Sequence, residues 1–74
     1  MNNDKFNKAL GNNLRTYREK TGMTQQEVAD KLGVTKVAVH QWESGKRSMY
    51  AQTLIDYCNV IGVSLDVIFE GVSV

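Results

Sequence analysis

The sequence of 74 residues contains no proline and a single cysteine, Cys58. One cysteine cannot close an intrachain disulfide or build a zinc cluster, so Cys58 is expected to be a small core residue. No apolar run approaches the roughly 18–20 residues that cross a bilayer. The polar residues 1–5 also lack the apolar segment of a secretory signal. We therefore expect a cytoplasmic protein without membrane contact, metal ion or cofactor.

Lysine and arginine are absent from the last part of the chain. Residues 49–74 hold three acidic residues and no basic one, which gives a net charge of −3. Residues 1–48 hold nine basic and five acidic residues, which gives +4, so the overall charge of +1 conceals a division. A basic front and an acidic back are typical of a domain that presents one face to a polyanion.

The alternation of apolar and polar residues that marks a half-buried strand is also missing, and apolar residues recur at helical spacing instead. With 42% hydrophobic and 23% charged residues, the composition is close to that of average globular domains. We expect one compact, all-α domain over residues 1–74 with its core in residues 6–69. Its five helices are expected over about residues 4–21, 25–32, 36–44 and 50–61, with a short fifth helix that begins at Ser64. The apolar residues expected to face inward are Phe6, Leu10, Leu14 and Tyr17 on the first helix, Val28, Ala29 and Leu32 on the second, and Leu54, Tyr57, Cys58 and Ile61 on the fourth.

The second and third expected helices carry clear start and stop signals. Thr24 and Glu27 form a capping box, in which each side chain accepts a backbone N–H that the helix leaves unpaired. Thr35 is a favoured N-cap for the next helix. Gly33 suits the turn between them, where a Cβ would hinder the backbone, and Ala29 is small enough for the two helices to cross closely. Residues 25–44 are therefore predicted to form a helix-turn-helix.

The outer face of the third expected helix is short, polar and free of acidic residues. At about 100° per residue, Val39 and Trp42 point inward together, and the opposite arc is centred on Val37, His40 and Ser44. Lys36 and Gln41 lie at the edges of this arc. Lys36 and His40 alone would be read as solvated side chains, but an exposed β-branched Val37 favours contact with a thymine methyl group. Such a face suits the major groove of DNA.

Two segments, TQQEVADKLGVT (residues 24–35) and VHQWESGKR (residues 39–47), resemble the helix-turn-helix of the Cro/phage-repressor (XRE) family. Residues 54–66 are similar to its fourth and fifth helices, so that the resemblance covers about residues 10–69. It implies a lambda-repressor-like fold of five helices. The chain departs from the family at Met49, where a proline is common, and at Ala51, where a larger apolar residue is common. Either Met49 or Tyr50 is expected to fill the gap.

The resemblance also implies roles for individual residues, which the chemistry of each side chain supports. Base contacts are expected from Lys36, Val37, His40 and Gln41. Phosphate contacts are expected from Gln25, Thr35, Ser44, Lys46, Arg47 and Arg15. Arg18 and Glu43 would form an ion pair that ties the basic loop after the third helix to the core.

These features predict a sequence-specific DNA-binding regulator of transcription, acting as a repressor on a palindromic operator. One small domain makes few base contacts, so a homodimer on paired half-sites is expected. The apolar residues near the C-terminus are read either as core with a fraying end or as a dimer surface, for which we name Val60, Val67, Phe69 and Val72. Val74 belongs to the same apolar tail.

Three alternatives stay open at this point. A restriction–modification controller and the antitoxin of a toxin pair differ from a repressor only in genetic context. A protein-interaction module that uses the acidic, apolar C-terminal surface is the alternative from another class. An enzyme is not expected, because the single histidine, His40, has no recognisable nucleophile and carboxylate partner and no phosphate-binding glycine loop is present.

Overall fold

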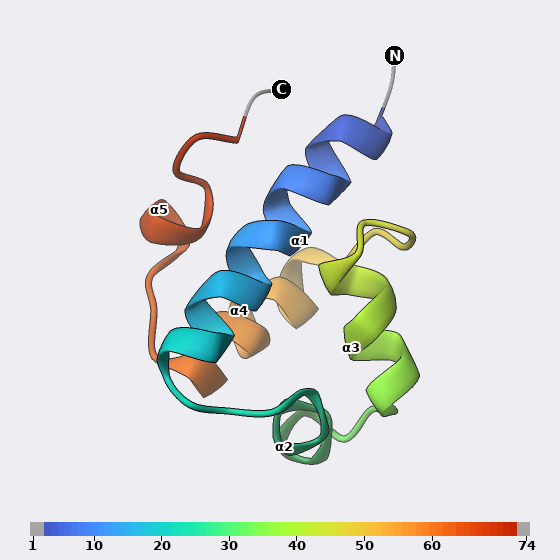
Figure 1. Ribbon diagram of the computed structural model, residues 1–74, viewed down its shortest axis with the longest axis vertical. Coiled ribbons are helices and arrows are strands. Elements are labelled where there is room, and N and C mark those ends of the chain that lie inside the picture. The colour runs from blue at the N-terminus through green and yellow to red at the C-terminus, as the bar shows by residue number, and fades with distance from the viewer. Residues whose placement is uncertain (1–2, 73–74) are drawn as a thin grey trace.

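The computed structural model describes residues 3–72, which form five helices (Figure 1). They are α1 (Asn3–Lys20), α2 (Gln25–Leu32), α3 (Lys36–Glu43), α4 (Ala51–Ile61) and α5 (Leu65–Ile68), and this described part contains no strand. The predicted all-α, five-helix architecture is confirmed. The helix ends differ slightly from the prediction: Ser44 is the C-cap of α3 and Tyr50 is the N-cap of α4.

The long helix α1 organises the molecule (Figure 1). The α2–α3 unit lies on one side of α1, and α5 lies on the other side. Helix α3 packs against both α1 and α2, whereas α4 contacts α1, α2 and α5. The helix-turn-helix therefore packs on one side of α1, and the C-terminal residues pack on the other side.

Apolar side chains from all five helices form the core. The largest side chains without exposure are Tyr57, Leu14, Ile68, Val28 and Val39. The inward residues predicted for α4 are all buried, and so are Trp42 and Cys58, as expected. Three residues predicted to face inward, Phe6, Tyr17 and Leu32, are only partly buried and pack at the margin of this core.

Gly11, inside α1, marks the closest approach between α1 and α3. A Cβ on Gly11 would lie 2.4 Å from the carbonyl oxygen of Trp42 and 2.6 Å from that of Glu43. Only a residue without a side chain allows the end of α3 to approach α1 so closely. The sequence contains a signal for this contact, since a glycine in a helix interior lowers stability relative to alanine and so indicates a packing requirement.

The predicted caps of the helix-turn-helix are present. The hydroxyl of Thr24 accepts the N–H of Glu27 at 3.1 Å, and the Glu27 carboxylate accepts the N–H of Thr24 at 2.9 Å. Thr35 accepts the N–H of Ala38 at 3.1 Å. Gly33 adopts a left-handed backbone with φ of 71°, and a Cβ there would meet no atom within 4 Å. Its requirement for glycine therefore comes from the backbone conformation rather than from crowding.

The connection from α3 to α4 shows which residue fills the gap left by Ala51. Met49 is partly buried and packs against the core, whereas the side chain of Tyr50 is 83% exposed. Ala51 itself is exposed at the start of α4. Tyr50 also makes no side-chain cap for α4. Met49 is therefore the residue whose side chain packs this connection against the core.

Candidate nucleic-acid interface

Helix α3 divides into a buried and an exposed face, as its sequence predicts. Ala38, Val39 and Trp42 are buried between α1 and α2. The recognition arc, by which we mean Lys36, Val37, His40 and Gln41, lies on the other side. Its first three members are exposed, with Val37 at 63%, and Gln41 is half-buried. An exposed valine beside lysine, histidine and glutamine gives this surface both apolar and hydrogen-bonding groups.

The C-terminal end of α3 is fixed by a buried carboxylate. Arg18 donates from Nε to Glu43 Oε2 at 2.8 Å and from Nη2 to Oε1 at 3.0 Å, so the ion pair implied by the resemblance is bidentate. Gln25 Nε2 donates to Oε1 at 3.0 Å, and the Tyr57 hydroxyl donates to Oε2. We call these four residues the Glu43 network. It joins α1, the start of α2, the end of α3 and α4 at one carboxylate.

The ionisation of this network is set by its own hydrogen bonds. Burial alone would raise the pKa of the Glu43 carboxyl, but the bonds from Arg18, Tyr57 and Gln25 outweigh burial and hold that pKa below its ordinary value. Burial, together with the bond to Glu43, raises the pKa of the Tyr57 hydroxyl far above its usual range. Glu43 is therefore a carboxylate, and Tyr57 is a proton donor to it.

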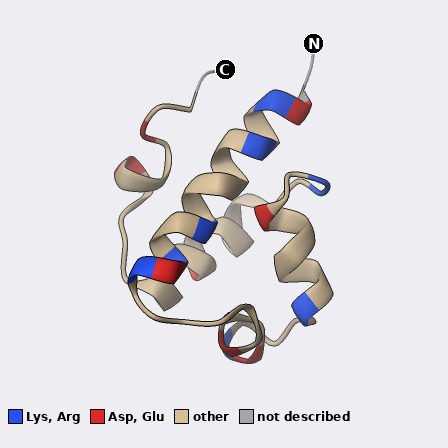
Figure 2. Cartoon of the chain, viewed as in Figure 1, with Lys and Arg blue, Asp and Glu red and all other residues tan. Residues whose placement is uncertain are grey.

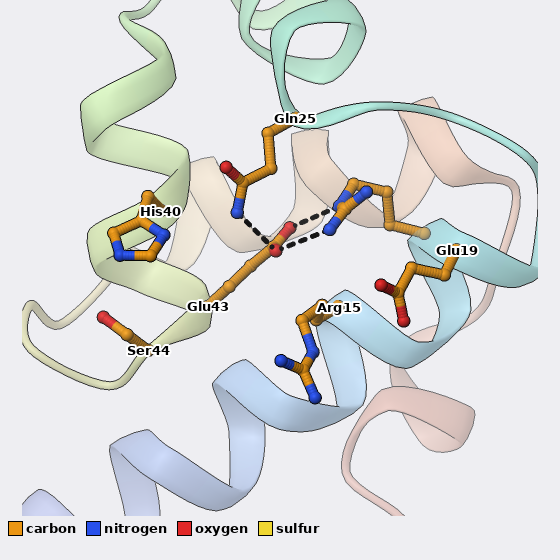
Figure 3. Close-up of a pocket in the computed structure, with 7 residues that line it drawn as sticks. Arg15, Glu19, Gln25, His40, Glu43 and Ser44 are labelled. Carbon is orange, nitrogen blue, oxygen red and sulfur yellow. Dashed lines mark hydrogen bonds and ion pairs between the residues drawn. The ribbon is translucent and has the colours of Figure 1, made fainter.

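Beside the network lies a hollow of about 280 Å³. Its lining comes from three helices, with Arg15, Arg18 and Glu19 from α1, Gln25 from α2, and His40, Glu43 and Ser44 at the end of α3. Figure 3 shows the Gln25 amide bonded to the Glu43 carboxylate, with His40 and Ser44 on the α3 side and Arg15 on α1. The structure thus brings together four residues expected to contact DNA, namely Arg15, Gln25, His40 and Ser44.

The basic loop, residues 45–48, continues directly from α3. The N–H groups of Lys46 and Arg47 donate to the carbonyl oxygen of Gln41 at 3.0 and 3.3 Å. Asn7 on α1 donates to the Ser48 hydroxyl at 3.0 Å. The loop is therefore held at both ends, and both of its basic side chains are exposed. Figure 2 shows basic residues at the tip of this loop, at the start of α3 and along α1.

The remaining residues expected to contact phosphates differ in how many side-chain hydrogen-bond donors are not already used within the protein. Gln25 uses one N–H of its amide for Glu43, and Ser44 donates its hydroxyl to the Gln41 carbonyl oxygen at 3.2 Å. The Thr35 hydroxyl accepts its cap bond, so its own proton is not used there. Arg15 is exposed and makes one long hydrogen bond, 3.5 Å from Nη2 to the Asn12 side-chain oxygen.

The residues named for a dimer surface are partly covered by their own chain. Val60, Val67 and Val72 are half-buried. Phe69 is 39% exposed, and its ring stacks on Phe6 with centroids 6.2 Å apart. Val74 lies outside the described residues. Three other large apolar residues in this half, Tyr50, Ile55 and Leu65, are exposed to a similar or greater degree and were not identified from the sequence.

Sequence reasoning missed the two partners that complete the carboxylate site. Tyr57 was expected only as an inward core residue, and Gln25 only as a phosphate contact. The polar hydroxyl on an otherwise apolar buried face of α4 was a usable signal, because a buried tyrosine hydroxyl normally requires a hydrogen-bond partner.

No helix between residues 3 and 72 is long and apolar enough to cross a membrane. In the same range, no three histidine, cysteine, aspartate or glutamate side chains are placed to hold a metal ion.

Solved structures of two gene regulators superpose on this chain. The clp gene regulator ClgR of Corynebacterium glutamicum superposes with a TM-score of 0.83 and 30% identity, over 88% of this chain and 85% of that one. An HTH_3 family transcriptional regulator of Vibrio cholerae superposes with a TM-score of 0.83 and 25% identity, over 93% of this chain and 39% of that one.

Three sequence relatives come from Bacillus subtilis (strain 168). The uncharacterized HTH-type transcriptional regulator YqaE is 43% identical over 82% of this chain and 53% of its own length. The SPbeta prophage-derived HTH-type regulator YonR is 36% identical over 84% of this chain and 57% of its own length. The HTH-type transcriptional regulator ImmR is 34% identical over 78% of this chain and 46% of its own length. The chain thus spans about half the length of these relatives.

The match to the family extends beyond the helix-turn-helix itself. The helix-turn-helix family HTH_3 matches residues 14–68, which run from α1 to the end of α5. This family comprises transcriptional regulators rather than enzymes, as the sequence predicts. The chain belongs to the XRE-type helix-turn-helix family HTH_3.

Proposed function

We propose that this chain binds double-stranded DNA sequence-specifically and represses transcription as a homodimer on a palindromic operator in the cytoplasm. The observation that carries the proposal is the recognition arc, of which Lys36, Val37 and His40 are exposed, together with the basic loop that follows it directly on the chain. Helix α3 would lie in the major groove and α2 would cross the sugar–phosphate backbone. Repression would follow where the operator overlaps a promoter, because bound protein then excludes polymerase.

The arc is assigned to base recognition. Gln41 would read adenine through its amide, Lys36 would reach guanine, and the Val37 methyl groups would contact a thymine methyl. His40, at the rim of the hollow, completes this surface. Because 63% of the Val37 side chain is exposed in the free protein, its contact with thymine would remove apolar surface from water on binding.

The surrounding residues are assigned to phosphates. Lys46 and Arg47 would bind one phosphate from the basic loop, and Thr35 would bind through its hydroxyl. Gln25 would bind through the second N–H of its amide, since that nitrogen has two donors and Glu43 takes one. Arg15 and Ser44 line the hollow beside it. These contacts set register and give the binding its salt dependence.

The homodimer is proposed from the exposed apolar side chains of the C-terminal half, including Phe69 at 39%. Two copies related by a two-fold axis would present α3 to half-sites about 10 base pairs apart. Sedimentation equilibrium of the free protein and of its DNA complex tests this assembly. One copy per duplex on a lone asymmetric site would contradict it.

Selection of bound sequences from a random duplex pool, followed by gel shift, tests the function. Gln41→Ala should lose discrimination at one base position, worth about 1–3 kcal/mol. Lys46→Ala should weaken specific and random DNA equally and lower the salt slope by about 1. Lys31→Ala removes the same charge from the exposed end of α2 and is the matched control. Equal losses for all three variants, or no shift together with capture of a protein partner, would contradict the proposal.

A further inference from the structure

Helix α1 carries a row of polar residues on the side that faces α3. At about 100° per residue, Lys8, Asn12 and Arg15 lie within about 60° of one another on this helix. Lys8, Asn12 and Arg15 are all exposed. The buried residues beside the row, Gly11 and Arg18, contact the end of α3. The row therefore runs along the same edge of the molecule as the C-terminal half of the recognition arc.

Lys8 lies against the basic loop. A Cβ on Gly45 would be 2.7 Å from both Cα and Cγ of Lys8, so the loop backbone packs directly on this residue. The neighbouring Asn7 holds the same loop through Ser48 at 3.0 Å. The position of Lys8 relative to Lys46 and Arg47 is therefore set by backbone contact rather than by side chains that move freely.

At its other end the row reaches the hollow. Arg15 lines the hollow together with Gln25, His40 and Ser44. Asn12 stands between Lys8 and Arg15, and its side-chain oxygen accepts the Arg15 guanidinium at 3.5 Å. The row thus connects two places, the basic loop and the start of α2, to which phosphate contacts are already assigned.

We propose that Lys8, Asn12 and Arg15 bind consecutive phosphates of one DNA strand along α1, with Lys8 as a phosphate contact outside the helix-turn-helix. The proposal rests on the proposed DNA-binding function and extends its footprint along α1 from Arg15 to Lys8. Asp4 precedes Lys8 by one helical turn, and the attraction between exposed opposite charges at this spacing is weak in water.

The test measures the slope of log Kd against log salt between about 50 and 200 mM, since each neutralised phosphate contributes about 0.9 to it. The variants are Lys8→Gln and Lys8→Arg, with Lys20→Gln as the matched control. Lys20 is on the same helix, about 120° away from Lys8, with its ammonium 4.8 Å from the Tyr17 ring centre. Thermal unfolding of each variant shows that the fold is retained.

A slope lower by about 0.9 for Lys8→Gln, restored in Lys8→Arg and unchanged in Lys20→Gln, supports the proposal. Ethylation interference should then lose one phosphate in Lys8→Gln. If Lys46→Gln lowers the slope but Lys8→Gln behaves like Lys20→Gln, the α1 contact is wrong and the proposed function stands. If the wild-type protein binds no duplex from the random pool, both proposals are overturned.

Discussion

The part of the molecule that carries the recognition arc, residues 3–48, and the part behind it, residues 49–72, are built in different ways. In the first part, α2 and α3 both begin with a side-chain cap, and a buried ion pair joins α1 to α3. In the second part, Ser64 caps only the short α5, whereas the longer α4 has no side-chain cap and a mainly apolar buried face. Directional polar bonds thus help to fix the part that carries the surface proposed to contact DNA. The part behind it, residues 49–72, is held mostly by apolar packing.

Besides the apolar core that they share, the two parts are joined by a few polar contacts. Tyr57 of α4 donates to the Glu43 carboxylate. In the other direction, Asn13 of α1 donates to the carbonyl oxygens of Ile68 at 2.8 Å and Glu70 at 3.0 Å. Because Glu43 is the last residue of α3, which carries the recognition arc, the bond from Tyr57 reaches one end of that helix from behind.

The largest effect is expected from Glu43→Ala. The substitution leaves Arg18, which is only 7% exposed, without its partner and also leaves the buried Tyr57 hydroxyl unpaired. Breaking a buried pair from one side costs about 3–5 kcal/mol of unfolding free energy. Urea unfolding measures the loss, with Glu19→Ala as an exposed control on α1. A loss below about 1 kcal/mol, the range of surface pairs, would refute the importance of the network.

Gly11→Ala should have the next largest effect. The added methyl group would lie 2.4 Å from the Trp42 carbonyl oxygen and would force α3 away from α1. Overpacking of this kind costs up to about 3 kcal/mol. Thermal unfolding reports the change, and Asn12→Ala on the exposed face of the same helix is the control. Equal melting temperatures for Gly11→Ala and wild type would show that the two helices separate without strain.

Tyr57→Phe removes one donor from the carboxylate but keeps the ring in the core. A hydrogen bond to a charged group contributes about 1.5–3 kcal/mol, so a loss of about 2 kcal/mol of unfolding free energy is expected. If the network positions the recognition arc, DNA affinity should also fall at a temperature where the variant is fully folded. Unchanged affinity would mean that Tyr57 contributes to stability but does not help to position the recognition arc.

Acid should lower the free energy of unfolding by protonating the Glu43 carboxylate. The pKa of Glu43 is lower in the folded chain than in the unfolded one, so its stabilising contribution is complete above the ordinary glutamate pKa of about 4.3. That contribution is lost as the pH falls through the lowered folded value. Urea unfolding at a series of pH values should show this decline in wild type and a weaker one in Glu43→Gln. Parallel curves would assign the acid sensitivity to other groups.

The smallest effect is expected near the C-terminus, from Phe69→Leu, which keeps most of the apolar side-chain surface but removes the stacked ring. The stacked pair with Phe6 is partly exposed, and such a pair adds about 0.5–1.5 kcal/mol beyond the area it buries. Monomer stability should therefore fall by about 1 kcal/mol. If the C-terminal half forms the dimer surface, sedimentation equilibrium should also show a weaker dimer, whereas Tyr17→Ala at the margin of the core should not change assembly.

The sequence predicts those features that depend on neighbouring residues. The capping box of Thr24 and Glu27 and the left-handed Gly33 are local, so the limits of α2 follow from a few adjacent residues. The inward face of α4 follows from its helical spacing. The contacts of Gly11 and Tyr57 were not predicted, because their partners lie 14 or more residues away and depend on how whole helices pack. A glycine inside a helix and a hydroxyl on an apolar face were the available signs.

The Glu43 network also bears on the kinetics of association. Its bonds fix the start of α2 relative to the end of α3 in the free protein. A surface that is already ordered loses little conformational freedom when its partner arrives. The rate of complex formation should then be limited by diffusional encounter and orientation, so that added salt slows association by screening long-range attraction.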